Sequence, residues 1–352
     1  MKRQTKAWRL ALIIACLLFG LGWFASSRQP ESSPTITFIP STPSTSVNKV
    51  PVPEQGAYLG VTIDFNGERS APDQLAEYQS LTGHLPAIGM WYVAAWEPEM
   101  EGMRQLVETG VIPFITFEPR RGSLDDLLAG QRDDRLRAWA RAIRELGSPV
   151  FFRFAHEMNG DWSPWSGAKN GGGGLGGFGD PALPDGPERY IAAYRHVYNL
   201  FADEGALNVS WVWSPNVLHG VPTDSWNWPD NYYPGDDYVD WVGMDGYNWG
   251  TAHPATSWQS FDEVFADSYT GWAAAHDKPV MIAEFASTEM GGHKAQWIAD
   301  AQNSLASKYP LVRAVTWFNL DKETDWRINS SPETQAAYAA FAGDPFFVQA
   351  GR

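Results

Sequence analysis

Two glutamates, each close to the end of an apolar run, are the residues of this chain best suited to chemistry. Glu157 lies in the segment 152–160 (FRFAHEMNG), and Glu284 lies in the segment 280–286 (VMIAEFA). Both segments are typical of buried strands. Because an unpaired buried carboxylate is costly, each glutamate is either a structural acid paired with a base or part of a reactive site. Paired carboxylates that flank a bond carry out glycoside hydrolysis.

A barrel of parallel strands would bring these two distant carboxylates together. From residue 57 onward, eight strand candidates alternate with amphipathic stretches. We expect strands at Tyr58–Phe65, Leu85–Tyr92, Val111–Phe117, Val150–Ala155, Val209–Trp213, Tyr238–Met244, Val280–Phe285 and Val312–Phe318. The clearest helices are expected at Pro98–Thr109, Leu124–Leu146, Pro187–Glu204, Phe261–His276 and Lys294–Lys308. This pattern predicts an α/β fold with a single (β/α)8 TIM barrel, whose strand ends meet at one rim. A doubly wound open sheet is the alternative, but no glycine-rich phosphate loop follows the first strand.

The alternation of side chains along a strand predicts which residues face the barrel interior. On the fourth expected strand, Arg153 and Glu157 share the inward face. A lone buried cation is costly, so Arg153 needs an acidic partner. On the seventh expected strand, Glu284 points inward together with Val280 and Ile282. The candidate partners of Arg153 are Asp64, Asp245 and the two glutamates.

The chain is rich in tryptophan, with 18 in all. Sugar rings present flat C–H faces that stack on indole, although any single tryptophan could equally be a core residue. Several at one rim favour a platform for a ligand. Two of them follow Glu157 and three end expected strands: Trp162, Trp165, Trp91, Trp213 and Trp317. Among the seven histidines, only His156 is assigned to the site, and none shows a paired metal spacing. We expect no metal and no cofactor.

The N-terminal part of the chain predicts export. Basic residues precede an apolar run at 10–25, so residues 1–25 are expected to be a signal peptide or an N-terminal membrane anchor. Residues 26–56 are rich in Ser, Thr and Pro and are expected to be a disordered linker. Residues 57–352 are expected to form the catalytic domain. The single cysteine, Cys16, is a leader cysteine or, less simply, a lipidation site. The expected location is extracellular, either secreted or tethered to the outer face of the membrane.

The net charge limits the partners that this chain can bind. The formal charge is −15, and the first 56 residues are net basic, so the remainder is strongly acidic. Such a domain does not attract nucleic acid or an anionic membrane, and we expect membrane attachment only through the N-terminal segment. A neutral β-linked polysaccharide is the expected partner, and a monomer is the expected state.

Three segments resemble a known family of enzymes. HEMNGDWSPW at 156–165, with an arginine three residues before its histidine, resembles the acid/base region of glycoside hydrolase family 26. VGMDGYN at 242–248 resembles the sixth strand of that family, and IAEFA at 282–286 resembles its nucleophile strand. The resemblance extends over residues 57 to about 343. That family comprises retaining barrel glycosidases, namely β-mannanases, mixed-linkage β-glucanases and a few β-1,3-xylanases.

The resemblance implies roles for individual residues. It implies that Glu157 is the acid/base and Glu284 the nucleophile. It further implies that Tyr247 donates a hydrogen bond to the nucleophile and that Trp317 forms the floor beneath the reacting sugar. His156 would stand where most related barrel glycosidases have an asparagine. Arg153 and Asp245 are expected to support the site.

We therefore expect an endo-β-glycanase that hydrolyses a plant-type polysaccharide by a retaining double displacement. Family frequency favours an endo-β-1,4-mannanase, which is our stated expectation. The stretch Asp161–Trp165 instead resembles the β-1,3-1,4-glucanase (lichenase) branch, which is the alternative. A non-catalytic barrel that binds glycan is a second alternative, although intact Glu157 and Glu284 speak against it. A metal-dependent hydrolase would need His and Asp groupings that are not seen in the sequence.

Overall fold

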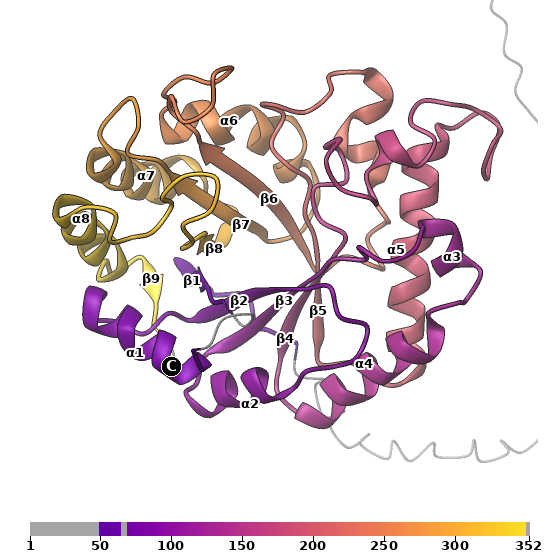
Figure 1. The fold of residues 1–352 in the computed structure, drawn as a ribbon, viewed down its shortest axis with the longest axis horizontal. Helices are drawn as coiled ribbons and strands as arrows, with labels where there is room; N and C mark the ends of the chain where they lie inside the picture. Colours follow the sequence, from indigo (N-terminus) through magenta and orange to yellow (C-terminus); the bar gives the residue numbers. More distant parts are fainter. Residues whose placement is uncertain (1–48, 65–68, 350–352) are drawn as a thin grey trace, which may run out of the picture. The chain divides into compact units, whose positions relative to one another are not determined.

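The strands of this protein close into a parallel barrel. The computed structural model describes residues 49–64 and 69–349. Its strands follow the order β2-β3-β4-β5-β6-β7-β8-β1, and β1 also pairs with β2, which completes the ring. The pairs are parallel, and helices lie around the outside of the strands (Figure 1). The predicted (β/α)8 barrel is therefore confirmed.

The elements alternate along the chain as the sequence predicts. The strands are β1 (Ala57–Thr62), β2 (Ile88–Val93), β3 (Ile112–Phe117), β4 (Val150–Phe154), β5 (Val209–Trp213), β6 (Trp241–Asn248), β7 (Val280–Ser287), β8 (Val312–Trp317) and a short β9 (Phe347–Val348) beside β1. The helices are α1 (Ala71–Thr82), α2 (Glu101–Glu108), α3 (Leu124–Leu128), α4 (Asp133–Leu146), α5 (Asp185–Asp203), α6 (Phe261–Gly271), α7 (Lys294–Lys308) and α8 (Pro332–Ala342). Four short 3-10 turns complete the described elements: Gly167–Lys169, Ser225–Asn227, Pro229–Tyr232 and Ala273–Ala275.

Several element boundaries differ from the sequence expectation, among them those of one expected helix and of the sixth strand. The single helix expected from Leu124 to Leu146 is divided into α3 and α4, because Gly130 adopts a φ of +76° that a helix cannot contain. The expected N-cap at Ser123 is present and forms a capping box with Asp126. Strand β6 runs to Asn248 rather than ending at Met244, so Asp245 and Tyr247 lie on the strand itself.

Apolar side chains pack in two layers, one inside the barrel and one between strands and helices. The interior cluster includes Ile88, Met90, Phe114, Phe151 and Met281, all essentially inaccessible to solvent. The outer cluster is larger and includes residues of all eight helices. The interior apolar layer fills the barrel below the rim formed by the C-terminal ends of the strands, and polar side chains gather at that rim.

A short segment before β1 packs against the barrel. Val50 is 4% exposed and belongs to the interior cluster. Its backbone N–H donates to Ser210 Oγ at 2.9 Å, and Lys49 forms an ion pair with Asp240 at 2.7 Å. The Tyr58 hydroxyl donates to the Pro51 carbonyl. Residues 49–51 lie within the expected linker, and here the structure differs from the expectation of a segment that does not pack, because Val50 finds an apolar site among the barrel strands.

We expect Val50→Ala to lower the free energy of unfolding by about 2 kcal/mol, because two buried methyl groups are removed from the interior cluster. Urea denaturation monitored by tryptophan fluorescence measures this change. The matched control is Val52→Ala, since Val52 is 46% exposed and should leave the midpoint within the error of the measurement. Equal effects of the two substitutions would contradict a stabilising role for residues 49–51.

The leader expected at residues 1–25 lies outside the described residues, as does the expected linker up to residue 48. Among the residues that the structure does describe, no helix has both the length and the apolar character needed to cross a bilayer.

Candidate active site

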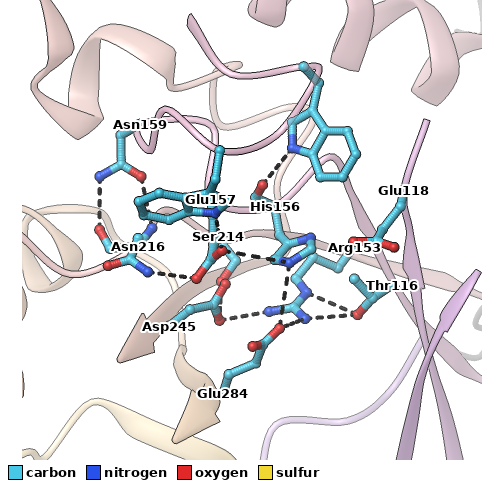
Figure 2. Close-up of polar contacts among 12 residues, drawn as sticks. Thr116, Glu118, Arg153, His156, Glu157, Asn159, Ser214, Asn216, Asp245 and Glu284 are labelled. Carbon is cyan, nitrogen blue, oxygen red and sulfur yellow. Dashed lines mark hydrogen bonds and ion pairs between the residues drawn. The ribbon is translucent and has the colours of Figure 1, made fainter. Parts of the chain in front are cut away.

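The two glutamates singled out from the sequence meet at one imidazole. Glu157 follows β4 and Glu284 lies near the end of β7. His156 Nε2 is 4.0 Å from Glu157 Oε2 and 3.7 Å from Glu284 Oε1. Figure 2 shows both carboxylates reaching the same space from opposite sides. The prediction that the barrel brings them together is confirmed.

A kink in the backbone after β4 turns Glu157 and His156 toward the site together. Ala155 and Glu157 have φ values of 50° and 53°, which non-glycine residues seldom adopt. Simple alternation along a longer strand would have put His156 on the opposite face from Glu157. The Glu157 N–H donates to the Ser214 carbonyl at 2.8 Å, which holds the kink against β5. Such strain persists where surrounding bonds fix the backbone, and it is common in active sites.

A pair of asparagines secures the same loop. Asn159 Nδ2 donates to the Asn216 carbonyl at 2.9 Å, and the Asn216 N–H donates to Asn159 Oδ1 at 2.8 Å. Asn216 also donates its own side-chain amide to Glu157 Oε1 at 2.6 Å (Figure 2). Asn216 lies just beyond β5 and was not identified from the sequence, where an isolated asparagine in a loop gives no functional signal.

The surroundings of Glu157 favour the protonated, uncharged form of its carboxyl group. Its side chain is 13% exposed, and its two oxygens accept bonds from Asn216 and from Trp162 Nε1, the latter at 2.8 Å. Burial raises the pKa of Glu157 to about 7, and the negative charge of Glu284 adds to the effect, while these two bonds act in the opposite direction. Glu157 can therefore hold a proton near neutral pH.

Arg153 is a fully buried cation beneath both catalytic candidates. Its Nη1 donates to Asp245 Oδ1 at 2.7 Å, and its Nη2 donates to Glu284 Oε1 (Figure 2). Thr116 Oγ1 accepts from Nη2 at 2.9 Å and from Nε at 3.1 Å. The expectation that Arg153 points inward and pairs with acids is confirmed, and its partners are Asp245 and Glu284. Ser214 donates to the same oxygen of Asp245 at 3.0 Å.

A β-bulge places Glu284 in the barrel interior. Met244 pairs with Ile282, yet the next residue, Asp245, pairs with Glu284, so β7 carries one extra residue at this point. Below the bulge, Met281 and Ala283 face the interior and Ile282 faces the helices. The expected inward direction of Val280 and Ile282 is therefore wrong, because the sequence pattern does not reveal the bulge that turns Glu284 inward.

Glu284 is surrounded by groups that favour its charged form. It accepts a hydrogen bond from the Tyr247 hydroxyl at Oε2 and has Tyr92 as a further hydrogen-bond partner. Burial by itself would raise the pKa of Glu284, but the Arg153 charge and these hydroxyl groups outweigh it and hold the pKa below its ordinary value. The bond from Tyr247 that the family resemblance implied is present.

His156 is a neutral residue in an aromatic setting. Burial, assisted by the charge of Arg153, lowers the pKa of His156 to about 3. Its ring lies 5.8 Å from the ring of Tyr92 and 5.9 Å from the ring of Trp165. A neutral imidazole donates one hydrogen bond and accepts another, so it can contact a sugar hydroxyl or a carboxylate without adding charge.

The five tryptophans that were predicted to contact a ligand lie in different environments. Trp162 is 45% exposed and bonds the acid candidate, so it can contact a ligand. Trp165 is 1% exposed and donates to the His156 carbonyl at 2.6 Å, so it supports the loop after β4 from beneath. Trp91 is 5% exposed and packs in the outer cluster, although it also borders a cavity beside the site.

Trp213 and Trp317 do not face the site, which corrects the sequence expectation. Trp213 is fully buried against Tyr233, Trp272 and His276. Trp317 is equally buried, against side chains of β7, α7 and α8. Because neighbouring strand residues point to opposite faces, both indoles lie in the helix layer. Trp317 therefore cannot form the floor beneath a sugar.

The aromatic wall of the site is formed by residues that the sequence did not single out. Phe318, one position after Trp317, has its ring 6.2 Å from Tyr92 and 5.5 Å from Tyr247. Trp326, in the loop between β8 and α8, lies 5.1 Å from Tyr247. Tyr92 likewise follows Trp91 by one position. A strict period of two along β2 and β8 would have identified Tyr92 and Phe318.

An open cavity of about 930 Å³ adjoins the site at Tyr92. Residues of the loop between β2 and α2 form much of its lining, including Ala94, Ala95 and Trp96. The two glutamates are not among its lining residues, so it extends the site sideways rather than containing the reactive groups. Its size is sufficient for more than one sugar ring.

Three buried residues of the site offer atoms that a metal could bind. His156, Asp245 and Glu284 have ligand atoms within 4.8 Å of one another. Arg153 donates hydrogen bonds to both of these carboxylates, and its guanidinium places a fixed positive charge among them. A metal ion would have to compete with that charge at close range, so the donor set does not fit one.

We expect kcat/KM on unactivated substrate to fall as the pH rises through about 7, because Glu157 must carry a proton in order to donate it. On the acidic side, activity should persist below the ordinary pKa of a glutamate, since Glu284 stays ionised. A pH profile of kcat/KM measures both limbs.

The variant Trp162→Phe tests the origin of the alkaline limb. Loss of the indole N–H removes a bond that stabilises the Glu157 carboxylate, so this limb should move to higher pH. Trp228→Phe is the matched control, because Trp228 is also exposed and its indole bonds a different acid, Asp230. An alkaline limb that Trp162→Phe leaves in place would show that Glu157 is not its source.

Comparisons with known proteins identify a matching family model and similar chains. Residues 123–326, which include both glutamates, match the family model of glycosyl hydrolase family 26. The chain is similar to Endoglucanase H of Acetivibrio thermocellus, with 38% identity over 293 residues, covering 82% of this chain and 30% of that protein. It is also similar to Mannan endo-1,4-beta-mannosidase A and B of Caldalkalibacillus mannanilyticus, with 34% identity over 189 residues, covering 52% of this chain and 31% of that protein. The chain thus spans less than a third of the length of these two relatives.

The fold is shared with solved structures. The structure of Bacillus subtilis mannanase man26 superposes with a TM-score of 0.60 and 20% sequence identity, covering 85% of this chain and 88% of that one. At this level of identity the likeness concerns the fold, which is the same (β/α)8 barrel.

Proposed function

This chain belongs to glycosyl hydrolase family 26, and from that premise we propose that it is an endo-acting β-glycanase with a retaining mechanism. The observation that carries this proposal is the unequal bonding of the two carboxylates. Glu284 accepts bonds from the Arg153 cation and from Tyr247, whereas the donors to Glu157 are the neutral N–H groups of Asn216 and Trp162. One acid is thereby kept ionised and the other can be protonated, as a double displacement requires.

In the first step of the proposed reaction, Glu157 donates its proton to the glycosidic oxygen while Glu284 attacks the anomeric carbon. A covalent glycosyl ester forms on Glu284, and the aglycone leaves as an alcohol. Esterification removes the negative charge of Glu284, so the pKa of Glu157 falls and Glu157 becomes a base. It then takes a proton from water, whose oxygen attacks the anomeric carbon, displaces the Glu284 carboxylate and releases a sugar of the original configuration.

The surrounding residues have supporting roles in this proposal. Arg153 holds Glu284 in place and keeps it charged, and Asp245 in turn anchors Arg153. His156, neutral and between the two carboxylates, is positioned to contact a hydroxyl of the reacting sugar. Trp162, exposed at the mouth of the site, offers a face for a neighbouring sugar. The cavity beside Tyr92 provides room for further units of an extended chain.

We propose a β-linked glucan as the leading substrate. The relative that covers 82% of this chain at 38% identity is named an endoglucanase, and this supports the glucanase alternative raised by the Asp161–Trp165 stretch. Mannan, the substrate first expected from the sequence, stays a second candidate, because relatives named mannan endo-1,4-beta-mannosidase match about half of the chain at 31–34% identity.

We expect a higher kcat/KM on barley-type β-glucan than on galactomannan. Glucose and mannose differ in the orientation of the C2 hydroxyl. A site that hydrogen-bonds this hydroxyl in one epimer leaves its polar groups unpaired with the other epimer, and kcat/KM on that other epimer is then lower by several orders of magnitude. Reducing-sugar release from purified protein measures both values, with cellulose and β-1,3-xylan as further substrates. A clear preference for galactomannan would refute the glucan assignment and leave the mechanism intact. No release from any of these polymers would favour a barrel that only binds glycan.

The stereochemistry of the first product is a separate test of the mechanism. A retaining double displacement predicts that the newly formed reducing end is the β anomer, which proton NMR detects before mutarotation. An α product would contradict the roles given to Glu157 and Glu284.

We also propose export of this protein, as a monomer, to the outside of the cell or to the outer face of its membrane. Support comes from the basic and apolar pattern of residues 1–25, and no nucleic-acid partner is proposed because the chain is strongly acidic. Fractionation of cells followed by mass analysis of the mature N-terminus would locate the protein and reveal any cleavage or lipidation at Cys16.

A further inference from the structure

An aromatic residue of the loop between β8 and α8 packs against Tyr247, the residue that donates a hydrogen bond to the proposed nucleophile. Trp326 is 1% exposed, and its ring lies 5.1 Å from that of Tyr247 and 5.0 Å from that of Trp249. Tyr247 donates its hydroxyl to Glu284 Oε2. The position of Trp326 therefore constrains the ring that orients Glu284.

Three successive backbone carbonyls of this loop are bound by two buried side chains. Lys294 Nζ donates to the Asp325 carbonyl at 3.1 Å and to the Arg327 carbonyl at 2.8 Å. Between them, the Trp326 carbonyl accepts from Trp317 Nε1 at 2.9 Å. The backbone on both sides of Trp326 is thus fixed from the helix layer behind the barrel.

Lys294 is an unusual residue for such a place. It is fully buried at the start of α7, and an ammonium group removed from water is costly unless all of its protons are bonded. Its third acceptor is Ser330 Oγ at 3.0 Å, so three protons meet three oxygens. Ser330 in turn donates to Glu289 at 2.8 Å, and Glu289 also accepts from Thr334 at 2.7 Å.

We propose, on the premise that Glu284 is the nucleophile, that Lys294 is a positioning residue for catalysis. By holding the carbonyls of Asp325 and Arg327, it fixes Trp326 against Tyr247 and thereby fixes the hydrogen bond from Tyr247 to Glu284. Trp317, which the sequence suggested as a sugar platform, serves the same purpose through the Trp326 carbonyl.

The charged groups around Lys294 and Glu284 determine the effect of removing the bonds that Lys294 makes to the loop. Burial lowers the pKa of Lys294 to about 8, and the cation is retained at neutral pH. The groups that face Lys294 are Glu289, Asp325 and Arg327. The titratable groups that face Glu284 include Arg153, His156, Tyr247, Tyr92, Glu157 and Asp245. Of these, Tyr247 contacts Trp326, so displacement of Trp326 weakens one donor to Glu284.

The test is Lys294→Met in the full chain, which keeps the unbranched side chain as far as its fourth atom and removes the ammonium group with its three donors. We expect kcat/KM to fall about tenfold to a hundredfold, as expected for a misplacement of order 1 Å near the reacting groups. The acidic limb of the pH profile should move to higher pH, because Glu284 loses stabilisation of its charged form. The alkaline limb, which reports Glu157, should stay in place.

A double-mutant cycle with Tyr247→Phe identifies the route of the effect. Tyr247→Phe alone should shift the acidic limb in the same direction. If Lys294 acts through Tyr247, the fold-loss of kcat/KM in the double variant is much smaller than the product of the two single fold-losses. Independent, multiplicative losses would overturn the proposed route.

Lys278→Met is the matched control. Lys278 also donates to a backbone carbonyl, that of Asp236 at 2.9 Å, but it lies just before β7, at the end of the strand remote from Glu284. It should leave kcat/KM and both limbs unchanged. If Lys294→Met lowers the unfolding midpoint but leaves the acidic limb in place, Lys294 is a structural residue only and the proposal is wrong. Lys294→Gln, which retains two donors, replaces the Met variant in the same experiment if that variant does not fold.

An error in the proposed function and an error in the role of Lys294 would give different experimental results. If Glu284 is not the nucleophile, Glu284→Gln retains activity in the otherwise unchanged chain. If only the role of Lys294 is wrong, Glu284→Gln is inactive while Lys294→Met has the activity and the pH profile of the unchanged protein.

Discussion

Replacing Glu284 by Gln is expected to lower kcat on β-glycan by about 10⁴-fold or more, because an amide cannot form the glycosyl ester. The change should leave the fold intact, since Arg153 keeps its pairing with Asp245 at 2.7 Å and one negative charge is removed from a crowded pocket. Steady-state assays on polymer and on aryl glycosides measure the loss. Both substrates should be affected alike, because both pass through the same intermediate.

Glu145→Gln is the matched control for this substitution. Glu145 lies exposed near the end of α4, and its ion-pair partner among the described residues is its neighbour Arg144, so kcat should not change. The mass of the intact protein gives a second readout. A slowly hydrolysed fluorinated glycoside should add one glycosyl mass to the unchanged protein and none to Glu284→Gln. A glycosyl adduct on the variant would contradict the nucleophilic role.

The same variant should change the other carboxylate. The charge of Glu284 contributes to the raised pKa of Glu157, so this pKa should fall in Glu284→Gln. A carbon-13 NMR titration of labelled glutamate measures the change without any need for activity. An unchanged or higher pKa would indicate that the two carboxylates are not coupled in the folded protein.

Replacing Glu157 by Ala is expected to lower activity on natural polysaccharide by about 10²–10⁴-fold, the range for a lost general acid. Aryl glycosides with good leaving groups need little protonation, so the first step should be nearly unaffected with them and the glycosyl-enzyme should accumulate. Azide needs no general base, so it should restore turnover and give a β-glycosyl azide as product.

The control for Glu157→Ala is Glu157→Gln, which keeps much of the shape and can still accept one of the two bonds that Asn216 and Trp162 donate to Glu157. It should show the same dependence on the leaving group, because it also lacks the acid. Equal losses on activated and natural substrates, or rescue by azide as an α product, would contradict the assignment of Glu157.

The local patterns of the sequence were sufficient for the architecture and for the reactive pair. Eight β-rich runs between amphipathic stretches predicted the closed barrel, because each strand and helix is encoded by a few consecutive residues. Glu157 and Glu284 stood out because a carboxylate after a buried run is costly without a purpose. The need to pair a buried cation gave four candidate acids for Arg153, and two of these, Asp245 and Glu284, are its partners in the structure.

The tertiary structure was needed for two kinds of feature: the face of the sheet to which each strand residue points, and contacts between residues far apart in the chain. Trp213 and Trp317 face the helices and not the site, since the direction of a strand-end residue follows from the pleat. Glu284 turns inward through a bulge between β6 and β7, and His156 joins Glu157 through a backbone kink. Neither irregularity has a pattern in the sequence.

By itself, then, the sequence determined the barrel, its two catalytic candidates and the need of Arg153 for an acidic partner, because these follow from periodicity and from the cost of buried charge. The tertiary structure alone decided that Trp326 packs against Tyr247, that Asn216 bonds Glu157, and that Val50 and Lys294 belong to the packed domain. Those facts rest on contacts between residues far apart in the chain. Closure of the barrel creates such contacts, and no short segment encodes them.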